Sequence, residues 1–296
     1  MQLIVTGDLH CTDKTPESRI DNYPAEQFSK ISSILKATKD LYPILQPGDF
    51  TDTPFLSYLY WRKLCSYFRG ATIYAIRGQH DMKYRNIGNT PLDALETALD
   101  DFHIVRKPIH LGENVYLYGA SFEENIPKIT TTGFNILLIH RMIVGSCEQE
   151  WEKDKGYDLA AQFLQKHKFD AIFSGDNHKS FTVLNADTPE TRHLINCGSL
   201  MRSKIDQIEH KPFYCLFDTE TRTYEKHFIP IKDWAEVFDI EKKLKTEKRN
   251  EKLEAFVEGL ALHKEMGLNF ADNLIEYEKA NNIPLELVKI RRSCMT

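Results

Sequence analysis

The sequence predicts an α/β core built on mixed sheets, followed by a small helical appendage at the C-terminal end. Short runs rich in β-branched residues alternate with amphipathic stretches over residues 3–176 of the 296, as expected for strands and helices in turn. Several strand-like runs without helices between them come next. From residue 238 the chain becomes rich in Lys and Glu and poor in Pro. We therefore expect a core domain over residues 1–237 and a helical appendage over residues 238–296.

Hydrophobic spacing and capping residues mark the alternating elements of residues 3–176. Phe28, Ile31 and Ile34 follow one another at helical intervals. Thr90 and Pro91 together are typical of a helix start, because Thr caps the first turn and Pro fits its first position. Strands are expected over residues 3–7, 42–49, 72–76, 135–140 and 169–176, and helices over residues 25–40, 55–68 and 157–167 and from residue 90 onward.

The later strand-like runs have no helices between them and are expected to form hairpins. The expected pairing joins residues 212–218 to residues 223–231. Further hairpin strands are expected over residues 115–120, 181–187 and 193–199, and the appendage is expected to form helices over residues 244–266 and 271–282.

Composition limits the classes of protein to which the chain can belong. A hydrophobic fraction of 42% over 296 residues allows a substantial buried core. The net charge of -5 argues against a surface coated with phosphate-binding lysines, although a local basic groove is compatible with it. The six cysteines include no CxxC pair, which favours reduced thiols over a disulfide framework or a zinc ribbon.

The N-terminal stretch MQLIVTGD lacks the basic region of a signal peptide, and no apolar run reaches membrane-spanning length. We therefore expect a cytoplasmic protein with no membrane association. No P-loop or dinucleotide-binding glycine motif occurs, so nothing indicates nucleoside triphosphate hydrolysis by such a loop.

Residues that can bind metals or transfer protons follow five of the expected strands. Open α/β sheets bind ligands at the carboxyl ends of their strands, where such residues converge. Each motif alone also fits an ordinary turn, since Gly and Asp are common turn formers. Five motifs at five strand ends are better explained by a shared metal centre. They are Asp8 and His10 in GDLH, Asp49 in GDF, Gln79, His80 and Asp81 in GQHD, His140, and Asp176 and His178 in GDNH.

The spacing of Asp8 and His10 supports a metal site. One residue separates them, so on an extended segment their side chains point to the same face. Two ligands of one ion need this arrangement.

The ordered set GDLH, GDF, GQHD, His140 and GDNH resembles the calcineurin-like metallophosphoesterase family, whose pattern is DxH, GDxxD, GNHD or GNHE, H, and GHxH. The resemblance spans residues 1 to 230. It implies two sheets packed together and flanked by helices, in four layers, with two divalent metal ions at the carboxyl ends of the strands. Within the family, the stretch INCGSLMRSKIDQ at residues 195–207 is most similar to the SbcD-like DNA-repair nucleases and their phage relatives.

The resemblance also implies a role for each site residue. His80 would lie close to the scissile phosphate, oriented by Asp81, and would stabilise the developing charge or protonate the leaving oxygen. A water activated between the two ions would attack the phosphorus without a covalent enzyme intermediate. Asp8, His10 and His178 would bind the first ion, Asp49 would bridge both, and Gln79, His140 and Asp176 would bind the second.

Two residues depart from the family pattern. Gln79 stands in the place of an asparagine, and its extra methylene loosens the position of the amide oxygen. Asp176 stands in the place of a histidine and offers a hard anionic oxygen, which suits Mn²⁺ or Mg²⁺ better than Zn²⁺. We therefore expect a manganese enzyme with a labile second ion, with Mg²⁺, Fe or Zn²⁺ as the other candidate metals.

These observations favour a metal-dependent phosphodiesterase, and in particular a DNA nuclease. Its C-terminal helices would bind an SbcC-like ATPase partner or a second copy of the chain. A phosphatase or a small-molecule phosphodiesterase is the alternative that the acidic net charge favours, since duplex binding depends on cationic contacts. A non-catalytic scaffold with the same fold is a third possibility, against which the ligand-capable side chains and His80 speak.

Overall fold

The computed structural model describes residues 1–38, 41–82, 90–146, 157–185, 190–239 and 277–279. The chain divides into two compact units, Met1–Asp239 and Ile240–Thr296. Of the second unit only residues 277–279 are described, and they are helical, so the helices expected over residues 244–266 and 271–282 lie otherwise outside the described residues. Within the described part of the chain, no helix is long and apolar enough to cross a membrane.

The first unit contains two six-stranded sheets, as expected for a two-sheet α/β fold. Each sheet contains four adjacent parallel strands. The first sheet adds two antiparallel strands at one edge, whereas the second adds one antiparallel strand at each edge. The first sheet has the order β14–β13–β1–β2–β3–β4, with bounds β1 Gln2–Val5, β2 Ile44–Gln46, β3 Ile73–Ala75, β4 Phe102–Ile104, β13 Phe213–Asp218 and β14 Thr223–Phe228. The second has the order β11–β12–β10–β7–β6–β5, with bounds β5 Ile109–Gly112, β6 Val115–Ala120, β7 Phe134–His140, β10 Ala171–Gly175, β11 Phe181–Asn185 and β12 Arg192–Asn196.

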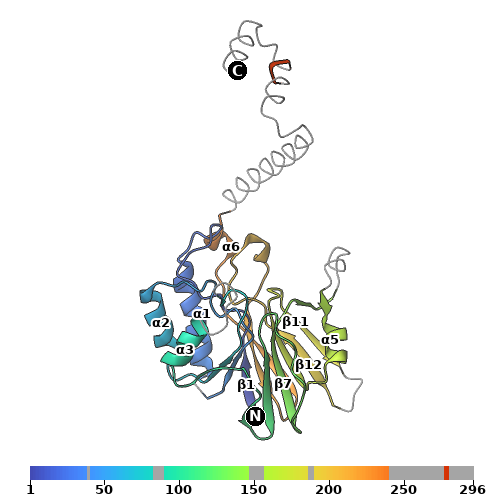
Figure 1. Cartoon of the computed structure of the whole chain (residues 1–296). Helices are drawn as coiled ribbons and strands as arrows, with labels where there is room; N and C mark the ends of the chain where they lie inside the picture. The colour runs from blue at the N-terminus through green and yellow to red at the C-terminus, as the bar shows by residue number, and fades with distance from the viewer. Residues whose placement is uncertain (39–40, 83–89, 147–156, 186–189, 240–276, 280–296) are drawn as a thin grey trace, which may run out of the picture. The chain divides into compact units, whose positions relative to one another are not determined.

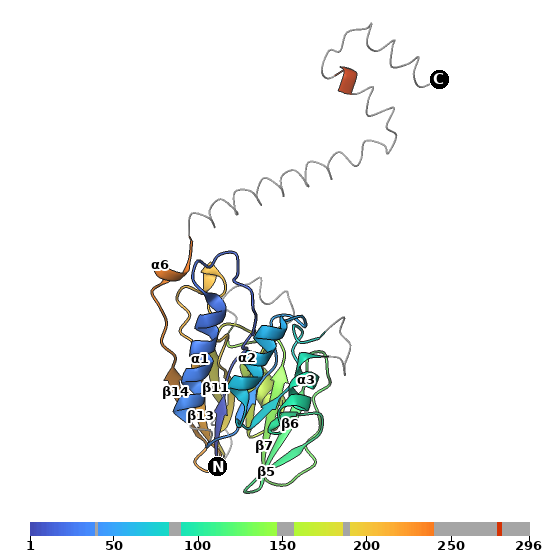
Figure 2. The ribbon, with the colours of Figure 1, turned by 90° about the vertical axis from the view of Figure 1, so that its left-hand side faces the viewer.

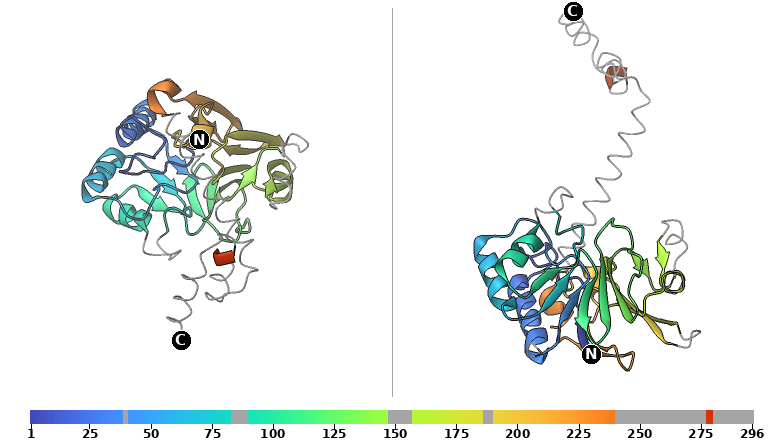
Figure 3. Two further views of the ribbon diagram at one scale, coloured as in Figure 1. Left: turned by 90° about the horizontal axis from the view of Figure 1, so that it is seen from above. Right: turned by 60° about the horizontal axis from the view of Figure 1, so that its bottom comes forward.

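Helices cover the outer faces of both sheets and complete four layers (Figures 1 and 3). Three helices cover the first sheet, as Figure 2 shows from their side; they are α1 Tyr23–Thr38, α2 Tyr58–Phe68 and α3 Pro91–Ala98. Helix α5, Ala160–Lys166, covers the second sheet. The remaining elements are the short strands β8 Ile143–Val144 and β9 Asp158–Leu159, the 3-10 helix η2 Ile205–Gln207 and helix α6 Trp234–Val237.

The alternation of side chains along the strands builds three layers of core. In β1, Leu3 and Val5 face the space between the sheets, whereas Ile4 packs against the helices of the first layer. In β7, Leu138 faces the other sheet and Leu137 packs against α5. Because both faces of these strands are buried, they read as continuous apolar runs in the sequence.

Local capping shifts some helix starts from the expected positions. Helix α2 begins at Tyr58 rather than at residue 55, because the Ser57 hydroxyl accepts a hydrogen bond from the Tyr60 amide and caps the helix. Helix α5 begins at Ala160 rather than at residue 157, since the two residues before it form β9. The start at Thr90 and Pro91 is confirmed, with a capping box between Thr90 and Asp93.

A buried arginine ties the end of the first unit to the loop that follows β1. The Arg19 guanidinium makes two hydrogen bonds, of 2.8 and 2.7 Å, to the Asp21 carboxylate and donates to the carbonyl of Arg202. It also lies 5.0 Å from the ring centre of Tyr23 and 5.2 Å from that of Phe238. One side chain therefore joins three segments that are distant in sequence.

Replacing Arg19 should destabilise the first unit without changing any of the polar residues at the strand ends. Arg19→Ala leaves the buried Asp21 carboxylate unpaired, and we expect the free energy of unfolding to fall by about 3 kcal/mol in urea denaturation followed by circular dichroism. Arg19→Lys should recover little, because an ammonium cannot form the two-pronged pair. Arg62→Ala, at an exposed arginine of α2, is the matched control and should change stability by no more than about 0.5 kcal/mol. Equal losses in the two alanine variants would contradict the role of Arg19.

Candidate metal centre

The structure brings the predicted site residues to one edge of the two sheets. Each one ends a strand or follows it closely, as expected for ligands at the carboxyl ends of parallel strands. Asp8 and His10 follow β1, Asp49 follows β2, Gln79, His80 and Asp81 follow β3, His140 ends β7, and Asp176 and His178 follow β10.

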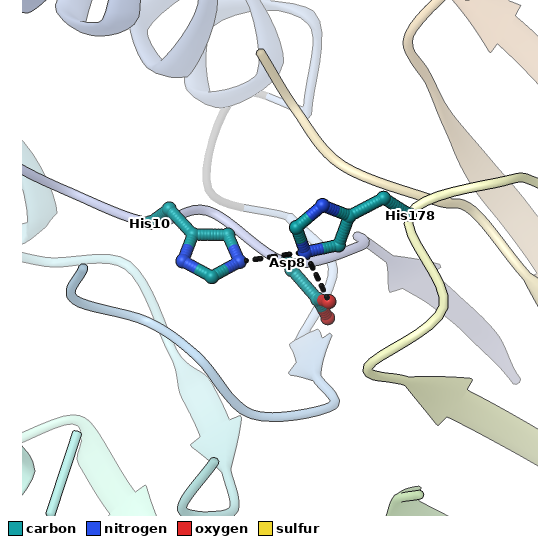
Figure 4. A group of neighbouring side chains, drawn as sticks. All are labelled: Asp8, His10 and His178. Carbon is teal, nitrogen blue, oxygen red and sulfur yellow. Dashed lines mark hydrogen bonds and ion pairs between the residues drawn. The ribbon is translucent and has the colours of Figure 1, made fainter. Parts of the chain in front are cut away.

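Asp8, His10 and His178 form the tightest cluster of potential ligands. One donor atom from each lies within 4.8 Å of the others, and Figure 4 shows the three side chains pointing toward one another, Asp8 and His10 from the segment after β1 and His178 from the segment after β10. The Nε2 atoms of His10 and His178 are 2.9 Å apart, and His178 Nε2 is 3.7 Å from Asp8 Oδ2. These are the residues predicted to bind the first ion.

Asp49 lies between this cluster and His140. Its Oδ2 atom is 3.7 Å from His10 Nε2 and 3.4 Å from His140 Nε2, while Oδ1 accepts a hydrogen bond of 2.8 Å from the His80 amide. The side chain is fully buried. This central place is the one that the predicted bridging ligand needs. The donor atoms of His10, Asp49 and His80 also gather within 4.8 Å, so His80 lies within reach of the same centre.

The second predicted group is held by contacts that orient its members. His140 Nδ1 lies 2.7 Å from the Pro47 carbonyl; a carbonyl only accepts, so Nδ1 carries the hydrogen and Nε2 is left to bind. The Gln79 amide donates to Asp176 Oδ1 at 3.1 Å. The Asp176 amide donates in turn to Asp8 Oδ2 at 2.9 Å, which links the two groups.

Burial and charge together set the protonation of the centre. Burial raises the pKa of Asp8 to about 7, although the charge of His140 opposes the rise. Burial disfavours the charged form of His140. Its contact with Asp49 and the charges of Asp49 and Asp8 outweigh the burial and raise the pKa of His140 to about 10. The contact with His140 likewise outweighs the burial of Asp49 and lowers its pKa to about 2. Burial and the nearby His10 lower the pKa of His178 to about 4, so its neutral ring offers a lone pair.

Several donor atoms of the centre fit a divalent cation. Asp8 Oδ1, Asp49 Oδ2 and His140 Nε2 are buried and have no hydrogen-bond partner among the described residues. An unsatisfied buried polar atom is costly, and these three lie on predicted ligands. Carboxylate oxygens and imidazole nitrogens are donors that Mn²⁺, Mg²⁺ and Zn²⁺ accept in proteins. The donor set therefore fits a divalent metal ion.

Two glycines allow the ligands to approach one another. A Cβ atom on Gly78 would lie 2.0 Å from Asp49 Oδ1. Gly48 has a φ of +99°, and a Cβ atom there would lie 2.4 Å from His140 Nδ1. No other residue type fits these positions without displacing a ligand. Close packing against the ligands therefore explains why glycine occupies positions 48 and 78.

Left-handed backbone at three ligands corrects one expectation. His10, Asp49 and Asp176 have φ values of 45°, 49° and 78°, a conformation that costs energy outside glycine and is concentrated at functional sites. The segment from Asp8 to His10 is therefore not extended. The two side chains do meet, but a left-handed bend at His10 brings them together rather than strand alternation.

The expected orientation of His80 by Asp81 is wrong. The Asp81 carboxylate is buried and accepts hydrogen bonds from the amides of Phe50, Thr51 and Gly78 and from the Thr51 hydroxyl. Burial and the charge of Asp49 raise its pKa to about 6. Asp81 therefore holds the loops that carry Asp49 and His80, and its two oxygens are occupied by these loops.

Asp52 is a site residue that the sequence analysis missed. Its carbonyl lies 2.9 Å from His80 Nδ1, and its carboxylate lies 3.3 Å from His10 Nδ1 and 3.7 Å from His80 Nδ1. Asp52 therefore orients both imidazoles. The signal was present, because GDFTD at residues 48–52 matches the family pattern GDxxD, but only its first aspartate was considered.

Two cavities open beside the centre. One, of about 250 Å³, is lined by Asp8, His10 and His178 and by the loop over residues 199–204. The other, of about 430 Å³, is lined by His140 and Asp176 and by acidic residues of neighbouring loops. A substrate can thus reach each ligand group.

Comparison with solved structures finds matches of low identity. A crystal structure of TT1561 of Thermus thermophilus matches with 11% identity and a TM-score of 0.49, covering 77% of this chain and 99% of that chain. A second crystal structure matches with 9% identity and a TM-score of 0.48, again covering 77% of this chain and 99% of the other. No curated protein matches the chain.

A family model gives the decisive comparison. The model described as calcineurin-like phosphoesterase matches residues 1–180, more than half of the chain. The matched segment includes every predicted ligand, from Asp8 to His178. Together with the two-sheet fold, this match shows that the chain belongs to the calcineurin-like phosphoesterase family.

Proposed function

We propose that this chain is a metal-dependent phosphodiesterase that cleaves DNA, as the SbcD-like DNA-repair nucleases do. Membership of the phosphoesterase family supports phosphoester hydrolysis, and the unpaired buried donors on Asp8, Asp49 and His140 support a metal centre. The nuclease assignment rests on the stretch over residues 195–207. Ser199, Met201, Ser203 and Lys204 of that stretch line the cavity beside the predicted ligands.

Asp8, His10, Asp49 and His178 would hold the first ion, and Asp49 would share the second with Gln79, His140 and Asp176. When bound, the cations would lower the pKa of a water and neutralise charge that develops on the phosphate.

The tautomer of His80 suits it to proton transfer. Its Nδ1 atom lies 2.9 Å from the Asp52 carbonyl and must carry a hydrogen, because a carbonyl only accepts. Its side chain is 42% exposed, so Nε2 is accessible to a substrate in the cavity that His80 lines. A protonated Nε2 can donate to the departing oxygen, and a neutral one can accept a hydrogen bond. Asp52 holds the ring in place for this role.

We further propose that the C-terminal segment, for which the sequence predicts helices, binds an SbcC-like ATPase partner or a second copy of the chain. The support is the Lys- and Glu-rich texture of residues 244–266. A solvated helix that only completes the fold is the alternative for this segment.

A phosphatase or small-molecule phosphodiesterase is the second candidate function. Glu123, Glu124 and Asp158 line the cavity beside His140, and acidic walls repel a long polyanion. The net charge of -5 points the same way.

A panel of substrates separates these functions. We expect metal-loaded protein to hydrolyse bis-nitrophenyl phosphate and linear duplex DNA faster than nitrophenyl phosphate. Asp49→Asn removes the shared ligand and should lower every rate by at least about 100-fold, since even outer partners of metal ligands cost 10–100-fold. Asp100→Asn, at an exposed carboxylate, is the control and should keep wild-type rates. Hydrolysis of the monoester alone would favour the phosphatase. If none of the substrates is hydrolysed in a metal-dependent reaction, the non-catalytic scaffold would be favoured.

The identity of the metal can be tested after chelation. The carboxylate of Asp176 in the second group is a hard ligand. We therefore expect the highest activity with Mn²⁺ when the chelated protein is supplied with each divalent metal in turn. A maximum with Zn²⁺ alone would contradict this expectation.

Metal binding should release protons, so the affinity for a divalent cation should rise with pH. Without metal the pKa of Asp8 is about 7 and that of His140 about 10. Both groups are protonated below the lower value, and only His140 remains protonated between the two, so a cation must displace these protons. Titration calorimetry in buffers of different ionisation enthalpy should detect the release. An affinity independent of pH would contradict it.

A further inference from the structure

The smaller cavity beside the first ligand group is close in size to a small-molecule site. Its volume is about 250 Å³, just below the range of about 300–1,000 Å³ that is typical of small-molecule sites. His10, His80 and His178 line it next to the predicted metals, and residues of the loop over 199–204 line it as well. A group bound here would touch both the reacting centre and this loop.

The cavity also has an apolar surface. Leu9, Pro16, Tyr23 and Met201 line it, and Leu9, Tyr23 and Met201 are held rigidly, because they are buried in the core beneath. Such a lining suits a sugar or a base rather than a second phosphate. The apolar surface therefore favours a nucleoside attached to the scissile phosphate.

Lys204 supplies a positive charge at the edge of this cavity. Among the described residues that line it, Lys204 is the only lysine or arginine. The side chain is exposed, and no carboxylate pairs with its ammonium in the described part of the chain. The charge is thus available to an anionic ligand.

Gln207 fixes the place of Lys204 relative to the ligands. Its side-chain oxygen accepts hydrogen bonds from the amides of Ser203, at 2.7 Å, and Lys204, at 3.1 Å. Its side-chain nitrogen lies 3.5 Å from Nδ1 of His178 and 3.4 Å from the Ser199 hydroxyl. The loop that carries the cation is therefore braced against a predicted ligand.

The larger cavity has no unpaired lysine or arginine among the described residues that line it. Glu123, Glu124 and Asp158 line the larger cavity, and the Arg141 guanidinium there is paired with Asp158 at 2.7 Å. A phosphate next to the scissile one is therefore favoured on the side of Lys204.

We propose that the smaller cavity is a nucleoside subsite and that Lys204 binds the phosphate on the far side of that nucleoside. Lys204 then selects diesters that carry a second phosphate, as a nucleic acid strand does, over small diesters that lack one. This inference rests on the proposed function, since it specifies the substrate of the same site.

Matched nucleotide esters test the role of Lys204. Thymidine 5′-(nitrophenyl phosphate) is compared with the same ester bearing a 3′-phosphate, and thymidine 3′-(nitrophenyl phosphate) with its 5′-phosphorylated form, so either strand polarity is covered. In one of these two pairs, the wild-type protein should prefer the ester with the additional phosphate by about tenfold in kcat/KM. The gain should come mainly from a lower KM, because Lys204 makes a charge-assisted hydrogen bond to that phosphate. Lys204→Ala should remove most of this preference, and Lys204→Arg should retain it.

Lys168→Ala is the matched control, because Lys168 is exposed and its ammonium donates to the Gln165 carbonyl away from the cavity. It should keep the wild-type preference. Thymidine 3′,5′-bisphosphate provides a readout without turnover, and its dissociation constant by calorimetry should rise about tenfold in Lys204→Ala. A preference and an affinity that Lys204→Ala leaves intact, or that Lys168→Ala lowers equally, would overturn the inference.

The results also separate this inference from the proposed function. Binding of the bisphosphate that depends on Lys204, without hydrolysis of any ester, would support the subsite and contradict the phosphodiesterase. Hydrolysis of the esters that ignores Lys204 would support the phosphodiesterase and contradict the subsite.

Discussion

Two buried carboxylates set the main constraint on this structure. Asp8 is 1% exposed and Asp49 fully buried, and each keeps an oxygen without a hydrogen-bond partner among the described residues. Buried anions need a nearby positive charge. Without metal, protonation of Asp8 and His140 meets this need, as their raised pKa values indicate. A divalent cation would meet it better, because it can contact both carboxylates at once.

The surrounding chain is arranged to keep these carboxylates in place. Asp81 accepts hydrogen bonds from the loops after β2 and β3, so the segments that carry Asp49 and His80 are fixed together. Burial and the charge of Asp49 raise the pKa of Asp81 to about 6. Above that pH the carboxylate is ionised, and an ionised carboxylate accepts stronger hydrogen bonds from these amides. The left-handed backbone at Asp49, with a φ of 49°, is stable only because such contacts over-determine it.

The sequence was sufficient to predict ten strands of the two sheets, most helices and the residues that gather at the sheet edge, but it missed the edge strands β4 and β5 and the short strands β8 and β9. Parallel strands place their carboxyl ends together, so motif order along the chain carries spatial information. The sequence was less able to predict which side chains contact one another inside the site. The sequence suggested that Asp81 orients its neighbour His80, but adjacent side chains in a bend point apart, and Asp52 from another loop meets that ring. The bend at His10 was equally hidden, since a non-glycine residue rarely takes a positive φ.

The two departures from the family pattern belong together. The Gln79 side-chain nitrogen donates to the Asp176 carboxylate at 3.1 Å. A histidine whose ring nitrogen binds a metal has no lone pair left on that nitrogen to accept this hydrogen bond, whereas a carboxylate can do both. This bond turns the amide oxygen of Gln79 away from Asp176 and limits the freedom that its extra methylene adds. The longer side chain and the shorter anionic partner therefore compensate each other in position. In charge they do not, because Asp176 adds a negative group that a histidine would not bring, and a second cation has more to neutralise here than in the usual pattern.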